Sequence, residues 1–441
     1  MAVGQGFFYI RFMDIAQLHS YFLENPKVST DSRKIEPGCI FFALKGPNFN
    51  GNTYAAQALE KGASYVVIDE VAYQTNEQTL LVDNVLETLQ HLAIFHRRYL
   101  KLPIVALTGS NGKTTTKELI HAVLKTKYQT VATKGNLNNH IGVPLTLLSM
   151  TKDTEIGVVE MGANHQKEIA FLCSIAEPDF GYITNFGKAH LEGFGGVEGV
   201  IKGKSELYDY LLAHDKHVFF NADDPIQKEK LAAYIKKFGF SESASQFYPN
   251  HLVHKQPTLH IALEDIQIHS QLMGEYNFPN CCAAIVIGKY FNVPVADIKA
   301  GIEAYLPDNN RSQLVQKGAH TLVMDAYNAN PSSMKAALEN FKAMNFEKTM
   351  LILGDMFELG EDSAKEHQAI ADLARSLEFD MVHLVGEHFS GANTSHPQYN
   401  SFEAFQEAFS PRFSETSWGI LIKGSRGMAL ERILTSFESE S

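Results

Sequence analysis

One short segment constrains the fold of this chain more than any other. Residues 105–116 read Val-Ala-Leu-Thr-Gly-Ser-Asn-Gly-Lys-Thr-Thr-Thr, so an apolar strand runs into a glycine loop and a Lys-Thr pair opens a helix. A helix N-terminus presents unpaired amides and the positive end of its dipole, which favour phosphate. Gly109 and Gly112 let the backbone curl around phosphate oxygens. Lys113 can neutralise the β- and γ-phosphates, and the Thr114 hydroxyl can reach Mg²⁺. The segment therefore predicts a site for ATP or GTP.

This loop departs from the general phosphate-loop pattern, because Gly109 and Gly112 are separated by two residues instead of four. A glycine-rich turn that only caps a helix is the structural alternative. The order of strand, loop, Lys-Thr and helix favours phosphate binding. The loop by itself does not separate a ligase from a motor or a switch GTPase.

The whole chain reads as three α/β segments. Its 441 residues suggest about three domains at about 150 residues each. Short β-branched runs alternate with helical patterns, which predicts mostly parallel sheets with ligands at the carboxyl ends of the strands. We place the domains at 1–101, 102–307 and 308–441, and residues 1–12 before Met13 read as a possible extension.

The secondary structure is predicted segment by segment. Strands are expected at 39–44, 64–69, 79–82, 104–107, 157–160, 181–184, 217–220, 321–325, 349–353, 381–385 and 420–423. Helices are expected at 53–61, 85–99, 278–291, 295–305, 332–342 and 363–377. Residues 241–268 are polar and alternating, and they read as an antiparallel appendage to the middle sheet.

The composition limits the class of partner. The chain has 38 Lys and Arg against 50 Asp and Glu, a formal net charge of −12, which argues against binding nucleic-acid phosphates. An anionic ligand must therefore be held by local amides, a few cations and metal. The four cysteines form no CxxC pair and fit a reducing cytosol. No apolar run approaches about 18 residues and the start lacks a secretory signal, so we expect a cytoplasmic chain without membrane insertion.

Two further residues stand where chemistry is expected, just beyond predicted strands. Glu160 follows the apolar run 156–159, so its carboxylate should emerge at the same sheet edge as the phosphate loop and could bind Mg²⁺ or orient water. His190 lies in a glycine-rich loop that a ligand could approach. Lys204, by contrast, reads from its neighbours as an ordinary solvated helix lysine.

Several motifs in this order resemble the Mur ligase family, the ATP-dependent amide-forming enzymes of peptidoglycan precursor synthesis. The resemblance runs from Met13 through nearly the whole chain and rests on the segments 108–115, 135–144, 159–163 and 190–192. The segments 325–331, 353–360 and 423–426 are similar to the members that add the terminal dipeptide. This implies a small α/β domain for a UDP-sugar, a central phosphate-loop domain with a mostly parallel sheet, and a carboxy-terminal Rossmann-like α/β domain.

The resemblance also assigns site residues. It implies that Lys204 is carbamylated by CO₂ and becomes an anionic ligand for a second Mg²⁺, so that the metal ligands are Thr114, Glu160, His190 and Lys204 and the catalytic set is Lys113, Glu160, His190 and Lys204. It implies nucleotide binding by Gly109, Ser110, Asn111, Gly112, Lys113, Thr114, Thr115, Asn277, Asn280, Arg311, Asp325 and Asn328. It implies substrate binding by Ser32, Arg33, Asn138 and Asn139. Tyr276 stands where the family commonly has histidine and Glu275 where it commonly has a basic residue, while Asn50-Gly51-Asn52 replaces the more usual Asp-Gly-His.

The activity implied is ATP-dependent ligation. The γ-phosphoryl group would pass to the terminal carboxylate of UDP-N-acetylmuramoyl-tripeptide, and the amine of D-alanyl-D-alanine would then attack the acyl phosphate and expel phosphate. The expected cofactors are ATP and two Mg²⁺ ions, and the chain is expected to be a monomer with small-molecule substrates. Two alternatives remain open: a folylpolyglutamate synthetase-like ligase on the same architecture, and a nucleotide-gated regulatory protein without catalysis.

Overall fold

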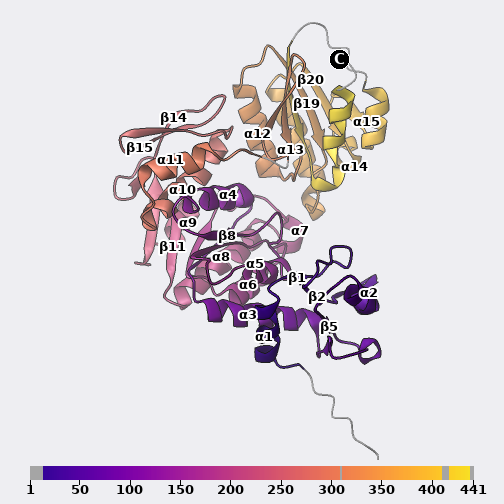
Figure 1. Cartoon of the computed structure of the whole chain (residues 1–441). Coiled ribbons are helices and arrows are strands. Elements are labelled where there is room, and N and C mark those ends of the chain that lie inside the picture. Colours follow the sequence, from indigo (N-terminus) through magenta and orange to yellow (C-terminus); the bar gives the residue numbers. More distant parts are fainter. Residues whose placement is uncertain (1–12, 308–309, 410–416, 438–441) are drawn as a thin grey trace, which may run out of the picture. The chain divides into compact units, whose positions relative to one another are not determined.

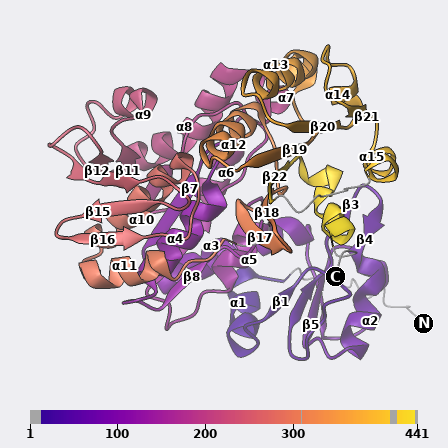
Figure 2. The same ribbon diagram turned by 90° about the horizontal axis from the view of Figure 1, so that it is seen from above.

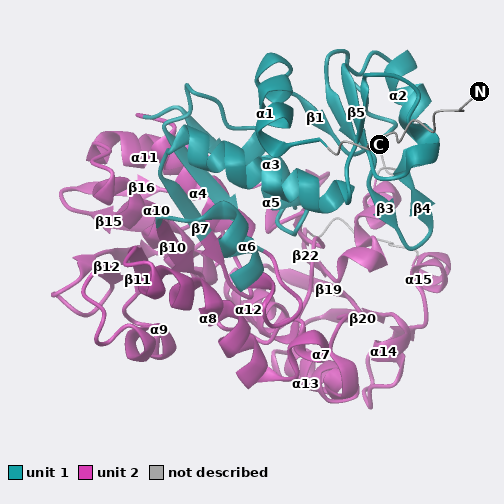
Figure 3. Cartoon of the chain, turned by 90° about the horizontal axis from the view of Figure 1, so that it is seen from below, with its two compact units in different colours: residues 1–106, 128–161, 170–179 teal, residues 107–127, 162–169, 180–441 magenta. Residues whose placement is uncertain are grey.

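The computed structural model describes residues 13–307, 310–409 and 417–437. The expected extension at 1–12 and residues 308–309 at the expected second domain border therefore lie outside the described residues. The chain separates into two compact units, one of residues 1–106, 128–161 and 170–179, the other of residues 107–127, 162–169 and 180–441 (Figure 3). The expected three-domain borders stay a prediction.

The first unit begins with a small parallel sheet of order β1-β2-β5-β6. Its strands are β1 Val28–Ser29, β2 Ile40–Phe42, β5 Tyr65–Ile68 and β6 Thr79–Leu81, and β3 Lys45–Gly46 pairs with β4 Phe49–Asn50 in a hairpin. The helices are α1 Ile15–Glu24, α2 Ala55–Glu60 and α3 Val85–Leu100, with 3₁₀ turns η1 Gly51–Tyr54 and η2 Val71–Tyr73. Helix α3 begins where the Asn84 side chain accepts a hydrogen bond from Glu87 N and ends at Lys101, which is left-handed.

The same unit contains strands β8 Thr130–Ala132 and β9 Ile156–Glu160, which pair in parallel, helix α5 Gly142–Leu148 and most of helix α6 Glu168–Ala176. The strands of the middle region follow the order β13-β12-β11-β10-β7-β9-β8. Strand β7, Ile104–Thr108, is buried at every position. Buried β-branched runs of this kind are typical of parallel sheets covered on both faces.

The second unit contains helix α4 Lys113–Leu124 and the parallel strands β10 Phe180–Ile183, β11 His217–Asn221, β12 Lys237–Ser241 and β13 Tyr248–Pro249. Its other helices in this region are α7 Leu191–Phe194, α8 Val197–Ala213, α9 Pro225–Lys230, α10 Phe278–Tyr290 and α11 Val295–Glu303, preceded by the 3₁₀ turn η3 Glu275–Asn277. Helix α10 is buried on all sides near its start, which explains its uniform apolar run of Cys, Ala, Ile and Val.

The expected antiparallel appendage at 241–268 was only partly right. Strands β14 His251–His254, β15 His260–Leu263 and β16 Ile266–His269 are antiparallel, but they form a sheet of their own (Figure 1). The start of the expected range extends the parallel sheet, because Phe240 of β12 pairs in parallel with Tyr248 of β13. Alternation alone cannot distinguish these two pairings.

The last region of the second unit is a six-stranded sheet of order β17-β18-β22-β19-β20-β21. The strands are β17 Gln313–Lys317, β18 His320–Asp325, β19 Lys348–Gly354, β20 Met381–Val385, β21 Gln398–Tyr399 and β22 Trp418–Lys423. All neighbours pair in parallel except β17 and β18. The helices are α12 Pro331–Ala343, α13 Ser363–Ser376, α14 Glu387–Ser390 and α15 Phe402–Ala408, with 3₁₀ turns η4 Gly360–Asp362, η5 Arg426–Met428 and η6 Leu430–Phe437.

Packing in this region follows the period of two expected for strands. Ile420 and Ile422, two residues apart on β22, belong to one core cluster with Phe405 of α15 and Ile433 of η6. Helix α12 begins at a capping box between Asn330 and Ser333, with Pro331 at its first position. The predicted α/β class with parallel sheets is confirmed. No helix in the described ranges is long and apolar enough to span a bilayer.

Candidate active site

The predicted phosphate loop connects β7 to α4 and requires its two glycines. Gly109 has φ +142°, and a Cβ there would lie 2.0 Å from Thr184 Oγ1. Gly112 has φ +77°, and a Cβ there would lie 2.7 Å from Asn280 Oδ1. A side chain at either position would therefore displace the loop. This close approach of bare backbone fits a cradle for phosphate oxygens.

The loop after β10 fixes the shape of the phosphate loop. Thr184 Oγ1 donates to Asn111 O at 2.5 Å, and Asn185 Oδ1 accepts from Asn111 N at 3.1 Å. Ser110 Oγ donates to Gly187 O at 2.7 Å. The hydrogen bonds of Ser110 and Asn111 are therefore made within the protein, and they hold the phosphate loop in its shape before any ligand binds.

Lys113 curls over its own loop. Its Nζ donates to Gly109 O at 2.7 Å and to Ser110 O at 3.3 Å. Lys113, Thr114 and Thr115 form the first turn of α4 and are only partly buried, so a ligand at the helix N-terminus can reach them. An ammonium group in this place raises the attraction for anionic oxygens that the helix dipole already provides.

Asn277 and Asn280 are brought to this loop from α10 and the turn before it. Thr116 Oγ1 of α4 donates to Asn280 Oδ1 at 3.0 Å, Asn280 Nδ2 donates to Asn277 Oδ1 at 2.8 Å, and Asn277 Nδ2 donates to Met273 O at 2.7 Å. Both amides are buried. The structure thus places them beside the phosphate loop, in a chain of hydrogen bonds that ends on α4.

Lys204 is not the solvated lysine that its neighbours in the sequence suggested. It is fully buried in α8, its Nζ donates to Ala163 O at 2.9 Å, and the ring of Phe194 lies 4.8 Å from Nζ. Burial, and next the charge of Lys113, hold the pKa of Lys204 well below its ordinary value. A lowered pKa favours the neutral form of the amine, which is the form that reacts with CO₂.

His190 caps α7 in a left-handed conformation with φ 53°. Its Nδ1 is paired with the Glu358 carboxylate, and this hydrogen bond lowers the pKa of Glu358. The neighbouring Lys188 donates from N to Ser332 Oγ at 2.8 Å and from Nζ to Glu366 Oε1 at 2.5 Å. Sequence reasoning missed these carboxylates, although Glu358 lies inside the segment 353–360 that marked the resemblance.

Asp325 and Asn328 gather around a buried lysine at the ends of β18 and β22. Lys423 Nζ donates to Asp325 Oδ2 at 2.6 Å and to Asn328 O at 3.3 Å. Arg311 stacks on the ring of Tyr327 at 3.5 Å from its centroid. The sequence places Lys423 in the segment 423–426 but does not predict its contacts with Asp325 and Asn328.

The side chain of Asn330 joins this region to the phosphate loop. Asn330 Nδ2 donates to Asn111 Oδ1 at 2.7 Å, while Asn330 Oδ1 caps α12 by accepting from Ser333 N at 2.9 Å. The start of α12 therefore lies against the loop that is predicted to hold phosphate.

Glu160, Asn138 and Asn139 belong to the first unit. Glu160 is buried at the end of β9, with Oε1 accepting from Asn138 Nδ2 at 2.8 Å and N donating to Thr133 Oγ1 at 3.0 Å. Asn139 Oδ1 accepts from Ile141 N and Gly142 N at the start of α5. The structure thus brings Asn138 to Glu160, and the expected place of Glu160 beside the phosphate loop stays a prediction.

Ser32 and Arg33 lie in an exposed loop of the first unit after β1. Arg33 makes a bidentate pair with Asp31, with both hydrogen bonds at 2.9 Å, and this pairing lowers the pKa of Asp31. Lys61 Nζ donates to Ser32 O at 2.9 Å. The loop is thus pre-folded with its guanidinium at the surface.

The side chains predicted to bind Mg²⁺ are chemically suited to it one by one, since they offer a hydroxyl, a carboxylate, an imidazole and a buried amine that could become a carbamate. No cluster of three or more His, Cys, Asp and Glu side chains poised for a metal is present within residues 13–307, 310–409 and 417–437. The predicted set contains only one carboxylate and one imidazole as it stands. An oxygen from carbamylated Lys204 is therefore what would complete it.

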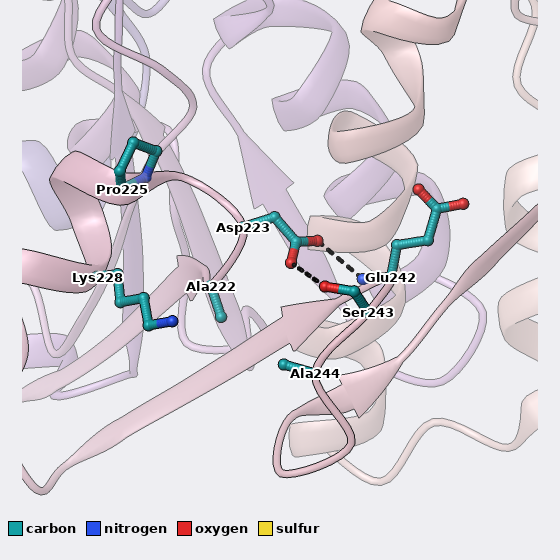
Figure 4. Close-up of a pocket in the computed structure, with 7 residues that line it drawn as sticks. All are labelled: Ala222, Asp223, Pro225, Lys228, Glu242, Ser243 and Ala244. Atoms are coloured by element: carbon teal, nitrogen blue, oxygen red, sulfur yellow. Dashed lines mark hydrogen bonds between the residues drawn. The ribbon is translucent and has the colours of Figure 1, made fainter.

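A separate cavity of about 650 Å³ lies at the ends of β11 and β12 and contains none of the predicted residues (Figure 4). Its acidic wall is formed by Asp223, whose carboxylate accepts from Glu242 N at 2.8 Å and from Ser243 Oγ at 3.4 Å. Because Asp223 is used to hold the turn after β12, the hollow does not compete with the phosphate loop as a candidate active site.

Comparisons with known proteins agree on one family. Residues 27–97 match the model described as "Mur ligase family, catalytic domain", residues 107–288 match "Mur ligase middle domain", and residues 310–425 match "Mur ligase, glutamate ligase domain". The UDP-N-acetylmuramoyl-tripeptide--D-alanyl-D-alanine ligase of Bacillus subtilis strain 168 is 33% identical over 446 residues, covering 96% of each chain.

Solved structures show the same architecture. A crystal structure of MurF from Acinetobacter baumannii has a TM-score of 0.80 and 31% identity and covers 94% of this chain and 93% of that one. The MurF ligase of Thermotoga maritima in complex with ADP has a TM-score of 0.81 and 26% identity and covers 95% of this chain and 98% of that one. With the phosphate loop in place and the match running along nearly its whole length, the chain belongs to the Mur ligase family.

Proposed function

We propose that this chain joins D-alanyl-D-alanine to the terminal carboxylate of UDP-N-acetylmuramoyl-tripeptide at the expense of ATP, giving UDP-N-acetylmuramoyl-pentapeptide, ADP and phosphate. The observation that carries the proposal is the 33% identity to a curated ligase of that name over 96% of both chains. The pre-formed phosphate loop of residues 109–116 supports the use of ATP, as does the ADP held by the Thermotoga maritima relative.

The chemistry needs activation because a carboxylate oxygen is a poor leaving group. Transfer of the γ-phosphoryl group to the tripeptide carboxylate forms an acyl phosphate and ADP, and attack by the dipeptide amine forms the amide and releases phosphate. Lys113 would offset charge on the transferring group from the first turn of α4. Asn277, Asn280, Arg311, Asp325 and Asn328 would orient the nucleotide, while Ser32, Arg33, Asn138 and Asn139 would bind the UDP-peptide.

Mg²⁺ would supply charge neutralisation at the transferring phosphoryl group. Thr114, Glu160, His190 and carbamylated Lys204 would hold two such ions. The burial of Lys204 and its lowered pKa support carbamylation, because only the neutral amine adds to CO₂. Carbamylation turns a cation that would repel Mg²⁺ into an anionic oxygen donor.

We further propose that the chain acts in the cytoplasm, where its nucleotide-linked peptide substrate would be available, and that it acts as a monomer. The test is phosphate release with UDP-N-acetylmuramoyl-tripeptides carrying diaminopimelate or lysine as the third residue, with and without D-alanyl-D-alanine. We expect release only when both substrates are present, together with a product heavier by one dipeptide. Release driven by a folate and glutamate would support the folylpolyglutamate alternative, and nucleotide binding without any release would support a regulatory protein.

A further inference from the structure

The contact between His190 and Glu358 joins two backbone positions that are both unusual. His190 has φ 53° and Glu358 has φ 61°, in the left-handed region that non-glycine residues rarely adopt. Such conformations persist where the surroundings hold them, and they gather at functional sites. Neither residue is in a tight hairpin that would demand this geometry, since His190 caps α7 and Glu358 precedes η4.

The turn containing Glu358 is seated directly on the start of α7. His190 Nδ1 is hydrogen-bonded to Glu358 Oε2, and Glu192 N donates to Glu358 O at 3.3 Å. Gly360 has φ +56°, and a Cβ there would lie 3.2 Å from Glu192 Cβ, so the turn packs closely against the start of α7. Helix α7 contacts the 3₁₀ turn η4, and η4 leads into α13, whose place is labelled in Figure 2.

Neighbouring contacts fix the loop that precedes His190. Lys188 is bound at both ends, through N to Ser332 Oγ and through Nζ to Glu366. Glu366 is buried in α13, which follows the Glu358 turn. The His190 loop is therefore held by α12 and by the segment around α13, and Glu358 is the member of this set that touches the imidazole.

An imidazole that binds a metal through one nitrogen commonly donates its other N–H to a carboxylate, which sets the tautomer and the ring orientation. With Glu358 at Nδ1, the lone pair of His190 is directed to Nε2. We infer that Glu358 is a positioning residue that holds the His190 ring so that Nε2 can bind the divalent cation of the proposed reaction. This inference rests on the proposed function, which makes His190 a metal ligand.

The arrangement also links the cation to the carboxy-terminal region. Glu358 comes from the stretch after β19, whereas His190 comes from the stretch after β10. The His190 ring is therefore oriented only while these two segments are docked. A cation bound through Nε2 would in turn favour the docked arrangement, because binding and docking share one contact.

The test uses the full-length protein with ADP present and Mn²⁺ as the probe, its free concentration followed by electron paramagnetic resonance. Glu358→Gln and Glu358→Ala are expected to raise the Mn²⁺ dissociation constant by about 10- to 100-fold. Glu361→Gln, an exposed carboxylate in the adjacent η4 turn, is the matched control and should bind Mn²⁺ as the unchanged protein does. Thermal unfolding of each variant shows whether it is folded at the temperature of the measurement.

A double-mutant cycle separates orientation of His190 from a general effect on the fold. In a His190→Ala background, Glu358→Ala should weaken Mn²⁺ binding no further, because its effect acts through the imidazole. In turnover, Glu358→Gln should lower kcat and leave KM for D-alanyl-D-alanine unchanged. Unchanged Mn²⁺ affinity in folded Glu358→Ala, or an equal loss with and without His190, would overturn the inference.

The Mn²⁺ measurement needs no turnover, so it stands apart from the proposed ligation. A protein whose Mn²⁺ affinity depends on Glu358 but which releases no phosphate with D-alanyl-D-alanine would support the positioning role and contradict the proposed reaction. A protein that ligates the dipeptide but whose Mn²⁺ affinity ignores Glu358 would do the reverse.

Discussion

Replacing Lys204 tests the buried amine directly, because its packing and its chemistry can be separated. Lys204→Ala removes three buried methylene groups at about 0.8 kcal/mol each and one hydrogen bond of about 1 kcal/mol, to Ala163 O. The free energy of unfolding should therefore fall by about 3 to 4 kcal/mol. Lys204→Met keeps most of the buried side-chain volume, so its free energy of unfolding should fall by only about 1 kcal/mol.

Activity should follow a different order from stability. Both variants lose the proposed carbamate and should release phosphate about 10²-fold more slowly or worse. Only Lys204→Ala leaves a cavity in which acetate or formate can stand in for the carbamate, so its rate should rise with carboxylate concentration. Lys204→Met fills that space and should not respond.

The assay pairs denaturant unfolding with phosphate release over a range of acetate and bicarbonate concentrations. Lys202→Ala, exposed two residues earlier in the same helix, should keep both stability and rate. Full activity in Lys204→Met would refute the role of a modified lysine. An acetate response of equal size in the Met and Ala variants would refute the cavity reasoning.

Three further outcomes are expected. Lys113→Ala should abolish ATP-dependent phosphate release while circular dichroism and thermal unfolding remain close to those of the unchanged protein, because Lys113 is only partly buried and bonds to its own loop. Gly109→Ala should weaken ADP binding, measured by calorimetry, by about 1 to 3 kcal/mol because a Cβ would meet Thr184 Oγ1 at 2.0 Å; Gly318→Ala, also at positive φ but with no atom near its Cβ, should bind ADP normally. Burial lowers the pKa of His19 from 6.5 to about 4, so the unfolded chain takes up its proton first and stability should fall by about 3 kcal/mol as pH drops from 6.5 to 4. Denaturant midpoints against pH should show this slope, and His19→Gln should flatten it.

Much of the fold could be predicted because its signals are local. The strand expected at 104–107 is β7 Ile104–Thr108, and the helix expected at 278–291 is α10 Phe278–Tyr290. The phosphate loop was likewise visible, since strand, glycines, lysine and helix follow one another without interruption. The pairing of the strands was harder to predict. The antiparallel edge strand β17, for example, has no sequence signal that distinguishes it from a loop.

The rest of the site depends on contacts between distant segments. Lys204 lies among charged and small neighbours in the sequence, which do not indicate that the folded chain buries its side chain, with Nζ bonded to Ala163 O and close to the ring of Phe194. Glu358 reaches His190 across 168 positions of sequence, so no spacing rule could join them. The segment containing Glu358 did mark the resemblance, but a resemblance carries no geometry for a residue whose role is unassigned.

The side chain of Asn330 forms hydrogen bonds with two different segments. Its Oδ1 caps the N-terminus of α12, and its Nδ2 donates a hydrogen bond to Asn111 in the phosphate loop. Serine, threonine and aspartate cap helices about as well, yet none of them carries an amide donor. Position 330 therefore tolerates fewer residue types than capping a helix alone would allow. A substitution at position 330 chosen only to stabilise α12 would remove the hydrogen bond to Asn111. It would therefore loosen the phosphate loop, 219 residues earlier in the chain.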